Sequence, residues 1–186
     1  ERFCDTSAAT ALAAKLAGEF VARYPAYRPE TVRGFMVHSA RWTDAMRNRA
    51  RFPDGSLDTV RLLRTFGHGV PDPEMLFYSA QNNLTLVAEG ELQPFFEDEG
   101  GALKSKDINY HRLPWPQEAL EALPFDTPIE MRVTLSYFIE PSPGERGWDR
   151  KYGYPSHGLR FQVIRPTETL EQFKLRINTY DRDEDY

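Results

Sequence analysis

The sequence predicts an α+β fold, in which a helical first half is followed by an antiparallel β-sandwich or jelly roll. Residues 7–22 are rich in Ala, the strongest helix former. Residues 129–137 alternate apolar and polar side chains, as a half-buried strand does. The hydrophobic period changes from helical to alternating near residue 82, so we expect domains at 1–82 and 83–186.

The first half is expected to form helices separated by segments rich in helix-breaking residues. The predicted helices span residues 7–22, 29–40, 60–66 and 73–80, and a turn-rich loop occupies 67–73. Pro29 suits the first turn of its helix, where its missing N–H costs nothing. Residues 7–22 are small or apolar on nearly all sides, apart from Lys15 and Glu19. Such a helix is usually buried in a larger protein, which predicts cover from an oligomer, a domain exchange or upstream chain.

The second half is expected to be mostly strands. The predicted strands span residues 84–90, 107–113, 129–137 and 159–163, with short helices at 116–123 and 169–177 and an acidic end at 181–186. Strands that alternate apolar with polar residues, with turn residues between them, favour an antiparallel sheet with one face buried.

Composition excludes some partners and leaves others open. The chain has 186 residues, is 40% hydrophobic and carries a formal net charge of −5, which argues against nucleic acid and anionic membranes as partners. No apolar run approaches the roughly 20 residues of a membrane span, and no signal peptide is visible. The single cysteine, Cys4, suits a reducing compartment, so a cytoplasmic location is expected. No metal or cofactor motif occurs, and we expect no cofactor.

The stretch CDTSAATA, residues 4–11, permits two interpretations of Ser7. In the first, Asp5, Thr6 or Ser7 caps the helix by accepting bonds from its first backbone N–H groups. In the second, Ser7 is a nucleophile at the positive end of the helix, and its own N–H helps to hold an oxyanion. The second interpretation also needs a base and a group that orients it.

Three blocks of sequence resemble the subtilisin-like serine peptidases, the subtilases. DTSAATALAAKLAG, from residue 5, resembles their nucleophile segment and its long buried helix. YPAYRPETVRGFMVHSA, from residue 24, resembles the next helix, and FGHGVPDPEMLFYSA, from residue 66, resembles the closing loop and last helix. The blocks follow the order of the family and cover residues 3–80. The strand-like stretches beyond them resemble the C-terminal β domain of a bacterial branch.

The resemblance implies a serine endopeptidase that hydrolyses peptide bonds through an acyl-enzyme. Ser7 would be the nucleophile and its N–H an oxyanion-hole donor, with Asp5 and Thr6 flanking it. Asp5 departs from the family, which usually has Gly there. The Asp and His of the triad precede the serine in this family, so they would lie upstream of Glu1, and residues 1–186 alone would be inactive. Residues 1–82 would then be the helical C-terminal remnant of an α/β subtilisin-like domain, and the partners a peptide or protein substrate and the upstream polypeptide.

The remaining polar residues have simpler interpretations. His38, His68, His111 and His157 are expected to be structural or solvated, and Cys4 structural. The alternative to the peptidase is a non-catalytic β-sandwich for binding or assembly, supported by the helices. A fluorophosphonate probe and the sequence before Glu1 would separate the two.

Overall fold

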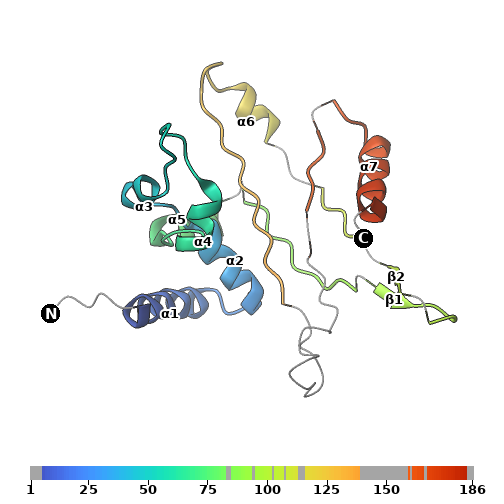
Figure 1. Cartoon of the computed structure of the whole chain (residues 1–186), viewed down its shortest axis with the longest axis horizontal. Helices are drawn as coiled ribbons and strands as arrows, with labels where there is room; N and C mark the ends of the chain where they lie inside the picture. The colour runs from blue at the N-terminus through green and yellow to red at the C-terminus, as the bar shows by residue number, and fades with distance from the viewer. Residues whose placement is uncertain are drawn as a thin grey trace. The chain divides into compact units, whose positions relative to one another are not determined.

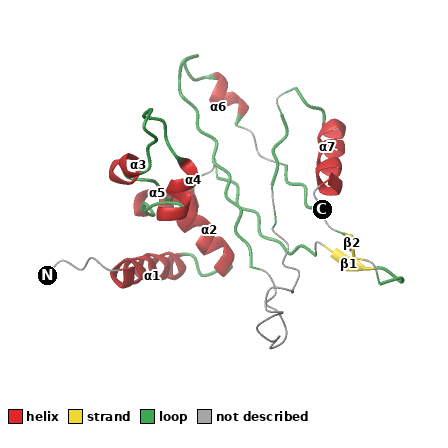
Figure 2. Cartoon of the chain, in the orientation of Figure 1, coloured by secondary structure: helices red, strands yellow, loops and turns green. Residues whose placement is uncertain are grey.

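The protein was studied as a computed structural model, which describes residues 6–82, 85–93, 95–101, 103–106, 108–112, 116–138, 159, 161–165 and 167–183. The chain divides into two compact units, Glu1–Phe138 and Ile139–Tyr186. The described residues are mainly helices and extended loops (Figure 2). The predicted division between residues 82 and 83 stays a prediction.

The first unit contains six helices and one hairpin among its described residues (Figure 1). They are α1 (Thr6–Arg23), α2 (Pro29–Ser39), α3 (Asp44–Arg49), α4 (Thr59–Phe66), α5 (Pro73–Gln81), β1 (Phe95–Glu97), β2 (Leu103–Ser105) and α6 (Gln117–Glu121). The second unit contains α7 (Leu170–Asp183). The predicted helices agree with α1, α2, α4, α5, α6 and α7, while α3 was not predicted.

Side chains at the N-termini explain where three of these helices begin. The Thr43 hydroxyl accepts from the N–H of Met46 at 3.3 Å and starts α3. The Asp58 carboxylate accepts from the N–H of Arg61 at 2.8 Å at the start of α4. Asp72 accepts from the first N–H groups of α5, which also has Pro73 at its first position. Each cap satisfies donors that have no partner inside the helix.

The core of the first unit lies where α1, α2 and α5 meet. Its buried residues are Phe20, Val32, Phe35 and Leu76, and Leu16, Tyr24, Tyr27, Met36, Phe77, Ala80 and Val87 pack against them. The Phe20 ring lies 5.0 Å from the rings of both Tyr24 and Phe35, measured between centroids. These tilted aromatic pairs add to the free energy of burial.

A backbone bridge ties the end of α2 to the loop before α5. Arg41 and Val70 exchange both of their N–H···O bonds, at 3.0 and 2.9 Å. Gly69 approaches the Arg41 backbone closely and has a φ of +100°. The sequence HGV therefore allows a close backbone crossing that a residue with a Cβ would obstruct.

The predicted β-sandwich or jelly roll is wrong for the described part of the chain. The strands found there form one two-stranded antiparallel hairpin, in which Phe96 pairs with Lys104. The acidic stretch at 95–101 supplies the first strand and the turn of that hairpin. The described residues of the predicted strands at 84–90, 107–113, 129–137 and 159–163 form no strand.

In the clearest alternating segment, residues 129–137, the apolar side chains are exposed and the polar ones contact the protein, which is the reverse of the prediction. Its apolar residues Ile129, Met131, Val133 and Leu135 are 59%, 45%, 40% and 40% exposed. Its polar residues Arg132, Thr134 and Ser136 instead hydrogen-bond to α2 or to the residue that follows it. The alternation correctly predicts an extended segment with one polar and one apolar side. The polar side faces α2, because this helix and the residue after it present hydrogen-bonding groups to the segment.

In the second unit, a charged pair joins Glu168, which precedes α7, to Arg176 within that helix. The Glu168 carboxylate accepts from Nε and Nη2 of Arg176 at 2.7 and 2.8 Å, and both side chains are largely buried. Thr169 and Gln172 form a reciprocal capping box, with bonds of 2.9 and 3.2 Å. The bonds from Arg176 lower the pKa of Glu168 from 4.5 to about 2.

Acid is therefore expected to loosen the second unit. Because the folded state binds the Glu168 proton more weakly than the unfolded chain, the pair stabilises the fold above pH 4.5. That contribution is lost as the pH falls from about 4.5 to about 2. Carboxyl NMR should give a Glu168 pKa near 2, and Arg176→Gln should return it toward 4.5.

Glu171 provides the control for this titration, because its carboxyl is exposed on the same helix. Glu171→Gln should leave the titration of Glu168 unchanged. A Glu168 pKa near 4.5 in the unsubstituted chain would contradict the bidentate pair.

Candidate active site

Ser7 lies in the first turn of α1 and is exposed to solvent. The helix begins at Thr6, whose carbonyl accepts a bond from the Thr10 hydroxyl at 2.9 Å. Since the first four N–H groups of a helix have no acceptor within it, the backbone N–H of Ser7 is available to a negative group. Asp5 and Cys4 lie outside the described residues, so the predicted capping by Asp5 has no structural test.

Most of α1 is exposed in the single chain, and the expected cover from an oligomer, a domain exchange or upstream chain stays a prediction. Phe20 is its one buried residue, whereas Leu12 is 69% exposed and Val21 is 44% exposed. Leu16 and Ala17 are partly buried against the core. The helix is thus anchored through its C-terminal half, and its serine-bearing half extends away from the core of the first unit (Figure 1).

No described histidine serves Ser7 as a base in this structure. His38 is half-buried on α2, where its Nδ1 lies 2.9 Å from the Thr134 hydroxyl. His68 and His111 are exposed, and no hydrogen bond joins either of them to Ser7. His157 lies outside the described residues. The expected structural role of His38 agrees with its contact to Thr134.

Both ends of α2 are held by extended segments from much later in the chain. At its start, Glu89 accepts bonds from the N–H of Arg28 and the hydroxyl of Thr31. These bonds, that of Thr31 most strongly, lower the pKa of Glu89. At its end, Arg132 donates to the carbonyls of His38 and Ala40. No local sequence signal predicts these contacts, because the residues that they join lie more than 55 positions apart.

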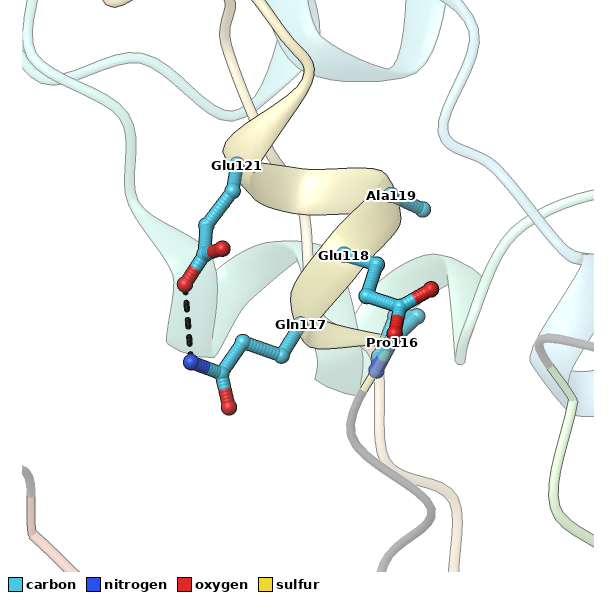
Figure 3. Close-up of a pocket in the computed structure, with 5 residues that line it drawn as sticks. All are labelled: Pro116, Gln117, Glu118, Ala119 and Glu121. Carbon is cyan, nitrogen blue, oxygen red and sulfur yellow. Dashed lines mark hydrogen bonds between the residues drawn. The ribbon is translucent and has the colours of Figure 1, made fainter.

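One open hollow lies beside α6, far along the chain from Ser7. Pro116, Gln117, Glu118, Ala119 and Glu121 line it, as Figure 3 shows. The amide of Gln117 donates to Glu121 at 2.7 Å across one helical turn. These residues supply neither a nucleophile nor a paired base, so we assign no site to the hollow.

Two kinds of feature, a metal-binding cluster and a membrane-spanning helix, are absent from the described residues. These residues hold no group of three or more His, Cys, Asp or Glu side chains that could bind a metal ion together. None of the helices there combines the length and apolar character needed to cross a bilayer.

Comparison with known proteins supports one family for the N-terminal part of the chain. Residues 1–69, of 186 in all, match the model of the subtilase family. This segment includes Ser7 and extends through α1, α2, α3 and α4. No curated protein and no solved structure matches the chain. The family resemblance is therefore confirmed within residues 1–69, while the resemblance of residues 70–80 to the last helix of the family, and that of the later segments to a β domain, is not.

Proposed function

We propose that the chain is part of a subtilisin-like serine endopeptidase, with Ser7 as its nucleophile. The observation that carries the proposal is the match of residues 1–69 to the subtilase family. The exposure of Ser7 in the first turn of α1 supports it, because an incoming carbonyl group can reach the hydroxyl.

The proposed reaction is peptide-bond hydrolysis in two steps. The Ser7 oxygen attacks the carbonyl carbon of a peptide or protein substrate while a base takes its proton. The backbone N–H of Ser7 and the positive end of α1 stabilise the oxyanion. The amine then leaves with the proton from the base, and water releases the acyl group from Ser7.

The base and its orienting carboxylate are proposed to come from polypeptide upstream of residue 1. This agrees with the family order Asp, His, Ser, and with the engagement of His38 by Thr134. On its own, an unactivated serine hydroxyl is a weak nucleophile at neutral pH. Residues 1–186 alone should therefore hydrolyse peptides very slowly.

A fluorophosphonate probe tests the proposal in the longest natural polypeptide that contains these residues. It should label Ser7, and Ser7→Ala should abolish labelling and lower peptide hydrolysis by about 10⁶-fold. Ser56→Ala is the matched control, since Ser56 is also exposed but bonds to Asp54 in a loop. His38→Gln, His68→Gln, His111→Gln and His157→Gln should all keep the labelling.

Two outcomes would count against this function. If Ser7 is never labelled, the chain is better explained as a non-catalytic binding or assembly component. If one of the four histidine substitutions abolishes labelling while the fold is retained, the base lies within residues 1–186 and the upstream assignment is wrong.

A further inference from the structure

The C-terminal end of α2 is capped by two guanidinium groups, one of them from far along the chain. Nη1 of Arg132 donates to the carbonyl oxygens of His38 and Ala40 at 2.8 and 3.0 Å. Nη1 of Arg41 donates to the same two oxygens at 3.2 and 3.1 Å. The last carbonyl groups of a helix have no N–H partner within the helix, so positively charged donors stabilise them.

Further polar contacts attach residues 130–138, here called the strap, to the side of α2 (Figure 1, light orange trace beside α2). Nε of Arg33 donates to the Ser136 hydroxyl at 3.0 Å, and its Nη2 donates to the carbonyl of Tyr137. The Arg33 guanidinium also lies 4.2 Å from the centroid of the Phe138 ring. At Gly34 the absence of a side chain admits the strap, because a Cβ there would lie 3.3 Å from that of Ser136.

The strap is thus held by hydrogen bonds and charge rather than by apolar burial. Its apolar residues Met131, Val133 and Leu135 are 45%, 40% and 40% exposed. Water competes for hydrogen bonds of this kind, so their net stabilisation is modest. A change of one charge beneath the strap can therefore alter how firmly it is attached.

We infer that the strap is a pH-sensitive latch, which protonation of His38 releases from α2. The His38 ring lies under the strap, with its Nδ1 at 2.9 Å from Thr134. An imidazolium could still donate to that hydroxyl. The cost of protonation instead comes from placing a positive charge in a half-buried position near Arg41.

Burial of the ring gives the latch its sign, because the strap covers His38 only in the attached state. Burial lowers the pKa of His38, the charge of Arg41 lowers it further, and Glu130 opposes both. Glu130 itself lies 3.1 Å from Arg132 and 4.0 Å from Arg41. The other ionisable groups on the helices that pack against α2 are Lys15, Glu19, Arg23, Glu74 and Tyr78, and none is among the causes of the shift.

Linkage then predicts release in acid. The attached state binds the His38 proton more weakly than a detached state with an exposed ring, so lowering the pH favours detachment. A single proton can change this equilibrium by at most about tenfold for each pH unit. Attachment is strongest at pH values above the ordinary pKa of histidine, near 6.5.

Hydrogen exchange followed by mass spectrometry tests the latch in the whole chain. Peptides from 128–138 should exchange faster at pH 5 than at pH 8 after correction for intrinsic rates, by up to tenfold for each pH unit below the ordinary pKa of histidine, near 6.5. His38→Gln should remove this pH dependence, whereas His68→Gln, a change in an exposed loop, should retain it. Glu130→Gln should increase the dependence, because Glu130 moves with the strap and its charge raises the pKa of His38 only in the attached state.

Either of two results would overturn the inference. In one, the strap of the unsubstituted chain exchanges equally fast at both pH values after the correction. In the other, His38→Gln retains the full pH dependence. Should His38→Gln fail to fold, a reduced dependence in Glu130→Gln would be equally decisive.

Discussion

Phe20→Ala is expected to lower the free energy of unfolding of the first unit by about 3–5 kcal/mol. Phe20 is 0% exposed, and its ring touches four others. The centroid distances are 5.0 Å to Tyr24 and Phe35, 5.9 Å to Phe77 and 6.1 Å to Tyr27. Removing the ring loses its transfer free energy and leaves a cavity that the surrounding aromatic rings fill only in part. Urea unfolding followed by circular dichroism measures the change.

Leu12→Ala provides the matched control in the same helix. Leu12 is 69% exposed, so the substitution should change stability by no more than about 0.5 kcal/mol. The comparison tests the placement of α1 directly. A loss of 2 kcal/mol or more for Leu12→Ala would show that the N-terminal half of this helix is covered in solution.

Gly69→Ala is expected to lower the free energy of unfolding by at least about 2 kcal/mol. Two costs combine at this position. The φ of +100° disfavours any residue with a side chain. In addition, a Cβ would lie 2.9 Å from the Trp42 nitrogen and still closer to the Arg41 carbonyl, where neither backbone group can move without breaking the bridge to Val70.

Gly55→Ala separates these two costs. Gly55 also has a positive φ, of +85°, but nothing lies within 4 Å of a Cβ placed on it. It should therefore lose only the conformational part, about 1 kcal/mol. Equal losses for the two substitutions, measured by thermal or urea unfolding, would argue against the close crossing of Gly69 over Arg41.

The sequence predicted those elements whose signals are local. Pro29 and Pro73 each occupy the first position of a helix, and the Ala-rich run of α1 lies where its composition placed it. The missed helix α3 has a Thr43 cap but only six residues and little apolar periodicity, so its cap alone was too weak a signal. Family resemblance of the N-terminal part could likewise be read from short motifs.

The sequence failed where structure depends on partners distant in the chain. Alternation at 129–137 gives two faces but does not say which face meets the protein, and α2 presented hydrogen-bonding groups to Thr134 and Ser136. The strand prediction also needed a neighbouring strand, which no local pattern supplies. For the candidate site, Ser7 lies at a helix start as the sequence predicted, whereas no motif in residues 1–186 identifies a base for it.

The hydrogen bond from Arg132 to His38 joins residues that lie 94 positions apart, which has a consequence during synthesis. Helices α1, α2 and α5 supply a core from the first 81 residues, so this part can collapse while the ribosome is still adding chain. At about 5–20 residues per second, roughly 5–20 seconds pass between the emergence of α2 and that of Arg132. For that interval Arg41 is the one of these two guanidinium groups that can cap the end of the helix, and the contact with Arg132 forms late in synthesis.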